Sequence, residues 1–325
     1  MAQFVEDELV LHTDFPSSRT YVPQGVIGGY PTTANVHRGQ RKLLLSEIEF
    51  LTKVHVSRLN RGGGDGPSIL LPRFLCVYAG ACPCTHLDYL LQLFPNVSFV
   101  LIDRRFAHEE FQWKQSHWDN KRVAVCAKPF DDCTTHAIAE WVRGVNTNHW
   151  IHAKLQSLDI NQNEVGYGNL LFISDIRRNA FDENSVAHDM DSQQQWFRNL
   201  YASAGLLKFR LPFCNKEWYR EYAEHRGVRS YLDGIIYLPI WGPPSTTECR
   251  LYVVRGCGVK NYYPEEHESL MAGFESYDRQ RKYTVANRVF NSFDEAAEAS
   301  VLYMYQQCMQ HYGYPVRLEG GFLKV

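Results

Sequence analysis

Long apolar runs are missing from this chain of 325 residues. No segment approaches the roughly 20 consecutive apolar residues that a membrane-spanning helix needs. The first residues read Met-Ala-Gln-Phe-Val-Glu-Asp-Glu and are acidic, where a secretion signal would be basic. We therefore expect a protein that is neither embedded in a membrane nor secreted, and that works in the cytoplasm.

Paired cysteine spacings are also missing. The nine cysteines are scattered singly and their number is odd, which disfavours a disulfide framework and indicates a reduced, intracellular protein. Cys82, Cys84 and His86 could be imagined as metal ligands, but no second cluster is present to complete a tetrahedral site. We expect no metal.

The chain also lacks an excess of positive charge. The chain has 34 basic and 36 acidic residues, for a net charge of −2. Any nucleic-acid partner must therefore be held by a local basic surface and not by bulk charge. The 45% hydrophobic content is ordinary for a globular protein, and the length suits one large α/β domain or two modest ones.

One stretch organises the rest of the chain. An apolar run over residues 74–79 meets Gly80, a short loop follows, and leucines then recur at helical spacing, which predicts a strand, a turn and a helix. In open α/β sheets a ligand lies at such a junction, and a glycine lets backbone approach it closely. The alternative is a turn that only connects a strand to a helix.

The glycines that are absent from this loop narrow the choice of ligand. A dinucleotide fold uses G-x-G-x-x-G, but here Cys82, Pro83 and Cys84 stand where further glycines would be, which disfavours a nicotinamide or flavin oxidoreductase. S-adenosylmethionine carries no phosphate and suits a loop with one glycine. Asp103 ends the next apolar run, about twenty residues on, where a carboxylate can accept hydrogen bonds from ribose hydroxyls.

Strand and helix patterns alternate through most of the chain. Helices are predicted near 42–54, 87–94, 192–203, 276–289 and 295–312, and strands at 74–79, 97–103, 122–127, 169–175, 204–211, 235–240 and 249–254. This order predicts an α/β fold with a doubly wound, mostly parallel sheet and flanking helices, whose last strands could be antiparallel. We expect an N-terminal arm over residues 1–36 and one domain over 37–325 with a helical C-terminal tail.

Four charged residues stand out from this pattern. Asp175 follows a buried strand, where it could serve the crevice or only start a turn. Lys208 interrupts an apolar strand, where it either faces a polar cleft or reaches past an edge to solvent. Glu248 heads a strand, and Lys42 is one of several basic residues at a helix start, which is electrostatically unfavourable for cations. Each could also be an ordinary surface residue.

Together these four have the order and placement of the Lys-Asp-Lys-Glu tetrad that methylates RNA ribose 2′-hydroxyls. The sequence resembles the poxvirus family of cap-specific mRNA 2′-O-methyltransferases, with the Rossmann-like methyltransferase fold. The resemblance runs through residues 39–47, 77–86, 101–105, 173–177, 207–213 and 248–251, with Trp218, and more faintly through 277–278 and the C-terminal helices.

The resemblance implies a role for each matching residue. Lys208 matches the general base, and Lys42, Asp175 and Glu248 match its partners. The positions that match contacts of S-adenosylmethionine are Gln40, Tyr78, Gly80, Cys84, Asp103, Arg105 and Phe130. Phe213 and, more weakly, Tyr21 match the two aromatic rings that enclose the cap guanine, and Asp278 the acid that reads its edge. Further expected cap or RNA contacts are Arg177, Arg178, Arg210, Asn215, Lys216, Thr246 and Thr247.

The activity that the resemblance implies is methyl transfer from S-adenosylmethionine to the first transcribed nucleotide of capped mRNA. Members of the family also serve as the processivity subunit of a viral poly(A) polymerase, so its catalytic subunit is an expected partner, in a viral factory or virion. Cys84 stands where the family has a second loop glycine, Asn215 replaces an acid, and Asp278 replaces a glutamate. These departures keep open a non-catalytic, RNA-binding accessory subunit with the same fold.

Overall fold

The computed structural model describes residues 33–61, 71–109, 111, 118, 121–166, 168–179, 182–212, 228–243 and 246–314. The chain divides into two compact units. The first comprises Met1–Ile69, Pro239–Thr247 and Tyr263–Val325, and the second comprises Leu70–Leu238 and Glu248–Tyr262. Most of the predicted arm lies outside the described residues, but its last residues, from Thr33 on, begin the helix α1 (Thr33–Arg61).

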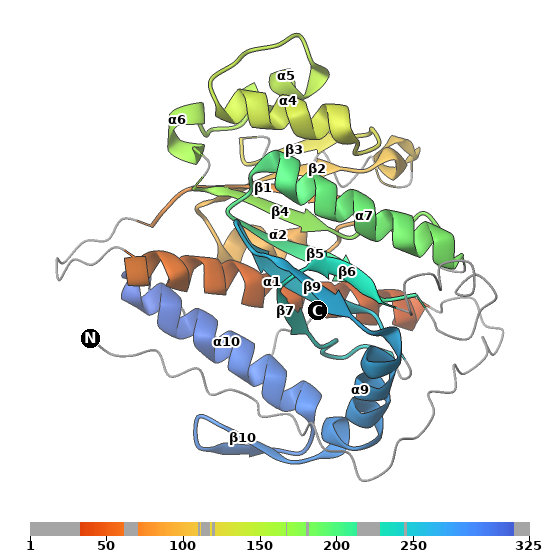
Figure 1. Cartoon of the computed structure of the whole chain (residues 1–325). Coiled ribbons are helices and arrows are strands. Elements are labelled where there is room, and N and C mark those ends of the chain that lie inside the picture. The colour runs from red at the N-terminus through yellow and green to blue at the C-terminus, as the bar shows by residue number, and fades with distance from the viewer. Residues whose placement is uncertain are drawn as a thin grey trace. The chain divides into compact units, whose positions relative to one another are not determined.

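The second unit is built on a seven-stranded sheet with the order β3-β2-β1-β4-β5-β8-β7 (Figure 1). Its strands are β1 (Phe74–Ala79), β2 (Val97–Ile102), β3 (Val123–Cys126), β4 (Leu170–Ser174), β5 (Ala204–Phe209), β7 (Ile235–Tyr237) and β8 (Cys249–Val254). The first five strands are parallel, and β8 runs antiparallel between β5 and β7. The predicted α/β class and mostly parallel sheet are confirmed, and the order is compatible with a Rossmann-like fold.

The central strands are apolar on both faces. Every residue of β1, β2 and β4 is buried, which explains why they read as continuous apolar runs without alternation. The second unit also contains α2 (Leu87–Leu93), η1 (Arg104–Ala107), α4 (Asp132–Val142), α5 (Trp150–Gln156), α6 (Gln162–Val165) and α7 (Glu183–Leu200). Helices α4 and α7 pack side by side, and α7 also contacts β5 (Figure 1).

Helix α7 is longer than the predicted helix at 192–203. Its N-terminus is capped by Asp182, whose carboxylate accepts hydrogen bonds from the backbone of Asn184 and Ser185. Its first half buries acidic side chains, among them those of Glu183 and Asp189. Acidic residues on the inner face interrupt the apolar periodicity, so the pattern did not reveal this half of the helix.

A small antiparallel pair, β6 (Arg229–Leu232) and β9 (Val259–Tyr262), belongs to the same unit and was not predicted. Three of the four β9 residues are exposed. Such a short and polar strand carries no apolar signal, and only its pairing with β6 defines it.

The first unit is mainly helical. It contains α1, α9 (Pro264–Ser276), η3 (Asp278–Gln280), the strands β10 (Tyr283–Val285) and β11 (Arg288–Phe290), and α10 (Phe293–His311). Helices α1 and α10 pack against each other (Figure 1). Among the described residues, no helix combines the length and apolar character that crossing a bilayer requires.

The helix predicted for residues 276–289 is wrong. Helix α9 ends at Ser276, the short η3 follows, and an antiparallel hairpin of β10 and β11 occupies the second half of that range. Ala286 and Asn287 form its two-residue turn and both have positive φ, +48° and +63°. Two successive left-handed residues match the twist of a β-hairpin and cannot continue a right-handed helix.

Candidate active site

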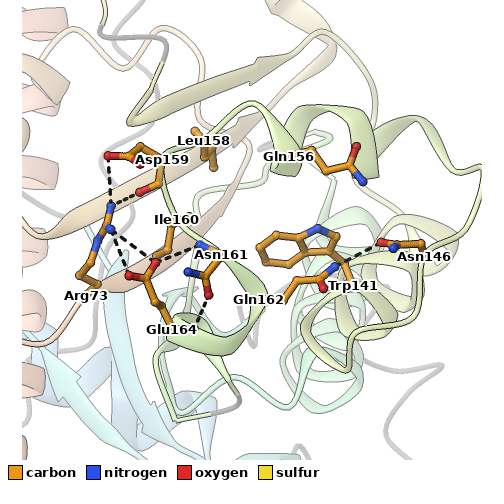
Figure 2. A pocket seen from close by; sticks show the side chains of 10 residues that line it. All are labelled: Arg73, Trp141, Asn146, Gln156, Leu158, Asp159, Ile160, Asn161, Gln162 and Glu164. Carbon is orange, nitrogen blue, oxygen red and sulfur yellow. Dashed lines mark hydrogen bonds and ion pairs between the residues drawn. The ribbon is translucent and has the colours of Figure 1, made fainter.

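The amino edge of the sheet carries a polar hollow of about 470 Å³ (Figure 2). Arg73, just before β1, lies on its rim and pairs with Glu164 of α6, with 3.3 Å between Nη1 and Oε1. Arg73 also donates to the backbone carbonyl of Asp159. The charged groups of this hollow therefore bind one another. None of the predicted site residues lines the hollow.

The opposite, carboxyl edge holds the turn after β1. Gly80 has φ +73°, and a Cβ there would lie 2.8 Å from the nitrogen of Ile176 and 2.9 Å from the carbonyl carbon of Asp175. A side chain at position 80 would therefore collide with the backbone that follows β4. Since strand order reverses between β1 and β4, this turn lies at the switch point where open α/β sheets bind ligands.

Asp103 joins the end of β2 to this turn. Its carboxylate accepts a hydrogen bond from the backbone of Cys82 (3.2 Å) and pairs with Arg105 at 2.7 Å. The hydrogen bond with Asp103 is the main reason that the pKa of Arg105 is raised, against the opposing effect of burial. The Asp103 side chain is 7% exposed and that of Arg105 is 50% exposed. The predicted ribose acceptor is thus held beside the turn by a half-exposed cation.

The other predicted cofactor contacts are more deeply placed. Tyr78 and Cys84 are each 1% exposed, and Cys84 has φ +46°, a conformation that favours glycine. Phe130 stacks on Phe172, with ring centroids 5.6 Å apart, and meets Trp196 edge-on at 4.9 Å. Its ring contributes to the hydrophobic core.

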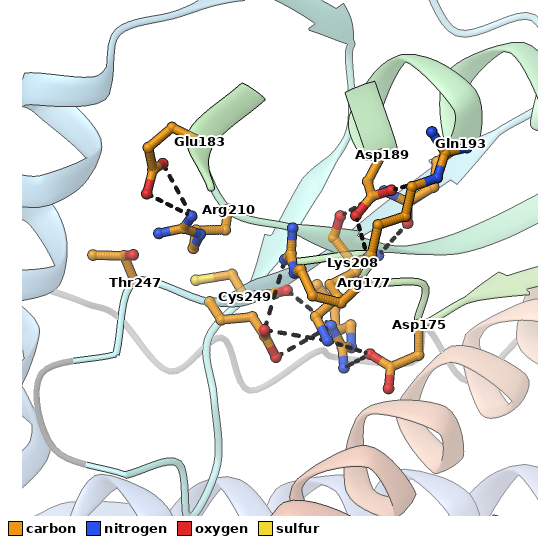
Figure 3. Close-up of polar contacts among 12 residues, drawn as sticks. Asp175, Arg177, Glu183, Asp189, Gln193, Lys208, Arg210, Thr247 and Cys249 are labelled. Carbon is orange, nitrogen blue, oxygen red and sulfur yellow. Dashed lines mark hydrogen bonds and ion pairs between the residues drawn. The ribbon is translucent and has the colours of Figure 1, made fainter. Parts of the chain in front are cut away.

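Three of the four predicted catalytic residues, Asp175, Lys208 and Glu248, meet at the carboxyl edge, and Figure 3 labels the first two. Lys208 Nζ lies 2.9 Å from Asp175 Oδ1 and 3.3 Å from Glu248 Oε2. Asp175 directly follows β4, Lys208 is near the end of β5, and Glu248 directly precedes β8. Because β8 is antiparallel to β5, its beginning lies beside the end of β5. All three side chains are mostly buried.

Two arginines complete this cluster. Arg250 Nη2 lies 2.6 Å from Asp175 Oδ1, and its Nη1 lies 3.6 Å from Glu248 Oε1. Arg177 Nη2 lies 3.7 Å from Glu248 Oε2. We define the charged cluster as these two arginines with Asp175, Lys208 and Glu248. Its three cations and two carboxylates leave one excess positive charge, which favours an anionic or electron-rich ligand.

Arg250 was missed by sequence reasoning. The signal was present, because an arginine within the apolar strand 249–254 poses the same question as Lys208 does in its strand. The two are direct cross-strand partners in the β5–β8 ladder. Only this register shows that both side chains serve the same carboxylate.

Asp175 is ionised in this setting. Burial disfavours its charged form, but the Lys208 ammonium and the Arg250 guanidinium more than offset this and hold the pKa of its carboxyl below the usual value. Burial also disfavours the charged form of a cation, and for Arg177 it therefore lowers the pKa of the guanidinium.

Two further ion pairs lie near the cluster. Arg210, a predicted RNA contact, is buried and pairs with Glu183 at 3.0 Å. Arg178 pairs with Asp189, with 3.4 Å between Nε and Oδ1, and its side chain remains 51% exposed. Of these two arginines, Arg178 is the one open to a phosphate group.

The remaining predicted residues lie in the first unit or outside the described residues. Lys42 and Gln40 lie in α1, and their predicted roles stay predictions. Asp278 is buried and pairs with Arg281 at 3.1 Å. The carbonyl of Thr247 lies 3.0 Å from His267 Nε2. The first unit also holds Thr246, whereas Tyr21, Phe213, Asn215, Lys216 and Trp218 fall outside the described residues.

The cluster holds a lysine amine at fixed distances from two carboxylates, next to a turn that has no side chain in the way. Such a group can orient or deprotonate a hydroxyl. Among the described residues, no group of three or more His, Cys, Asp or Glu side chains could hold a metal ion. No family model matches this sequence, and no curated protein matches it.

Proposed function

We propose that this chain is a methyltransferase that uses S-adenosylmethionine to methylate the 2′-hydroxyl of the first transcribed nucleotide of capped mRNA. The observation that carries the proposal is the position of Lys208 Nζ between Asp175 and Glu248. The resemblance in sequence predicted these three residues as partners, although they are far apart in the chain. Their meeting at the carboxyl edge of the sheet supports the proposal.

The turn after β1, next to the cluster, supports the choice of cofactor. Gly80 leaves the backbone bare, and the loop after it lacks the further glycines that a pyrophosphate would need, so a nucleoside without phosphate suits it better. Asp103 offers a carboxylate for ribose hydroxyls, and Arg105 beside it is the next predicted contact of the cofactor. When bound, S-adenosylmethionine supplies an electrophilic methyl group on a sulfonium.

The residues of the cluster then position the second reactant. In its neutral form, reached when the ammonium loses its proton to solvent, the Lys208 amine would contact the 2′-hydroxyl and direct its oxygen toward the methyl carbon. It would take up the hydroxyl proton as the new C–O bond forms and the methyl–sulfur bond of the cofactor breaks, which leaves the sulfur neutral. Asp175 and Glu248 hold the amine in place. Such positioning of reactants supplies much of the rate in reactions of this kind.

The direct test is methyl transfer from labelled S-adenosylmethionine to short RNAs that end in an N7-methylated cap, an unmethylated cap or no cap. We expect 2′-O-methylation of the first nucleotide, fastest with the methylated cap. No transfer to any RNA, with no cofactor binding in a calorimetric titration but binding of capped RNA retained, would instead support an accessory subunit.

Replacing the central amine gives a sharper prediction. Lys208→Ala should lower the rate of methyl transfer by about 10² to 10⁴-fold, the usual contribution of a positioned acid or base, and leave the affinity for capped RNA unchanged. Lys154→Ala, at an exposed position of α5, is the matched control and should retain full activity. Near wild-type transfer by Lys208→Ala would contradict the role.

The same resemblance gives a proposed partner, the catalytic subunit of a viral poly(A) polymerase. We expect the two chains to co-elute in size-exclusion chromatography and the complex to lengthen poly(A) tails processively. Two separate peaks at micromolar concentrations would exclude a stable complex.

A further inference from the structure

The backbone of Lys208 lies beyond the end of its neighbouring strand. The pairing of β4 with β5 ends at Ser174 and Leu207, one residue before Lys208. On the other side, Lys208 is paired with Arg250 of β8. The β4 side of Lys208 therefore needs another partner for its backbone groups, because a mostly buried N–H or C=O is costly to leave unpaired.

Gln193 of α7 fills this place. Its Oε1 accepts a hydrogen bond from the Lys208 backbone N–H at 3.1 Å, and its Nε2 donates to the Lys208 carbonyl at 3.3 Å (Figure 3). The Gln193 side chain is 1% exposed. A primary amide carries the same acceptor and donor as a peptide group, so one side chain continues the pairing that β4 ends.

Helix α7 holds Gln193 in position from both sides. Asp189, Gln193 and Phe197 follow one another at spacings of four residues and lie on one face of the helix. Asp189 is fully buried and accepts a hydrogen bond from the backbone of Arg178 at 3.0 Å. Phe197 packs closely on Gly205 of β5, where a Cβ would lie 2.9 Å from its ring. The helix is thus fixed to the segment after β4 and to β5.

We infer that Gln193 is a positioning residue, which sets the place of the Lys208 amine by clamping the backbone of that lysine. Lys208 Nζ must remain within hydrogen-bond reach of both Asp175 and Glu248, and the side chain can do so only while its backbone is fixed. This inference rests on the proposed methyl transfer. The clamp itself can be tested without it.

The test compares Gln193→Leu with the same substitution at an exposed position of the helix, Gln195→Leu. Gln193→Leu removes both hydrogen bonds at similar volume. We expect the kcat of methyl transfer to fall by about 10 to 100-fold, as for a reacting group misplaced by about 1 Å, with the KM for S-adenosylmethionine within about twofold of wild type. Gln195→Leu should match wild type in both constants. A wild-type kcat in Gln193→Leu would overturn the inference.

A second variant gives a readout that loss of packing would not produce. In Gln193→Glu, an ionised carboxylate still accepts from the Lys208 N–H but repels the Lys208 carbonyl, whereas a protonated carboxyl can donate to it. The kcat of this variant relative to wild type should therefore rise as the pH falls. A ratio that does not change with pH would contradict the clamp, and this variant also serves if Gln193→Leu fails to fold.

Hydrogen exchange separates the inference from the proposed function. The amide of Lys208 should exchange at least about tenfold faster in Gln193→Leu than in wild type or Gln195→Leu, because its acceptor is lost. An unchanged exchange rate would overturn the clamp even in an active enzyme. If the wild-type protein transfers no methyl group, the proposed function fails, and the exchange comparison still decides whether Gln193 holds Lys208.

Discussion

At the scale of single residues, the charged cluster depends on charge compensation in a mostly buried place. Asp175 receives both Lys208 Nζ and Arg250 Nη2 on the same oxygen. Removing one member of such a set leaves the others buried without full compensation, which usually costs more than the contact itself contributes. The cluster should therefore affect stability as well as activity.

Asp175→Asn tests this, with a defined dependence on pH. We expect a loss of about 3 kcal/mol in the free energy of unfolding at pH 7, at the lower end of the range for breaking a buried ion pair. The folded-state pKa of Asp175 is below its ordinary value of 3.8, so its contribution is present above pH 3.8 and is lost as the pH falls through the lower, folded-state value. Urea unfolding at pH 7, 5 and 3 should show the difference from wild type narrowing only below about pH 4. A constant difference would contradict the charge argument.

Cys84 carries strain of another kind, in the backbone. Its φ of +46° costs an L-residue about 1 kcal/mol that glycine does not lose. We expect Cys84→Gly to be more stable than Cys84→Ala by about 1 kcal/mol in thermal or urea unfolding. The same pair of substitutions at Cys126, in β3, should give the opposite order, because glycine weakens a strand. Equal stabilities at position 84 would mean that the backbone relaxes there.

At the scale of elements, the contact between α7 and β5 determines the geometry of the site. Gly205 allows the Phe197 ring to lie where a Cβ would be only 2.9 Å away. The helix that bears Gln193 therefore cannot keep its position if β5 gains a side chain there.

Gly205→Ala should destabilise the protein by about 1 to 3 kcal/mol, the usual cost of overpacking a core. The double variant Gly205→Ala/Phe197→Leu should recover part of this loss, since leucine leaves room for the methyl group. Gly39→Ala, in a helix with nothing within 4 Å of the new Cβ, is the control and should be neutral or slightly stabilising. Additive effects of the two substitutions in a double-mutant cycle would refute the close contact.

At the scale of the whole molecule, the net charge of −2 means that the proposed RNA substrate would have to be attracted by local positive charge. Arg178, beside the charged cluster, is half exposed and available for such a contact. Binding of a single-stranded RNA should thus depend on salt through a few contacts near the carboxyl edge of the sheet.

Arg178→Ala should weaken the binding of capped RNA and reduce the slope of log K against log salt by about 0.7, the value for one phosphate contact on a single strand. Arg198→Ala, at an exposed position of α7, should leave the slope unchanged. The dissociation constants can be measured by fluorescence anisotropy at salt concentrations from about 50 to about 300 mM. Identical slopes for wild type and Arg178→Ala would exclude a phosphate contact at this residue.

Most strands of the central sheet could be predicted from the sequence alone. Continuous apolar runs encode strands that are buried on both faces, and such strands end in polar residues at one edge of a parallel sheet. This is why Gly80, Asp103 and Asp175 could be placed at one edge of the sheet from the sequence, because each is a change of residue type at the end of an apolar run. The pattern left two readings open for Lys208, and only the resemblance grouped it with Asp175 and Glu248.

Tertiary structure decided the rest. The antiparallel insertion of β8 beside β5 brings Arg250 to Asp175, and the end of β4 leaves the Lys208 backbone to Gln193. The order of the strands and the point where two strands stop pairing depend on contacts between distant segments. Such contacts produce no periodic pattern in the sequence, so they could not be predicted from it.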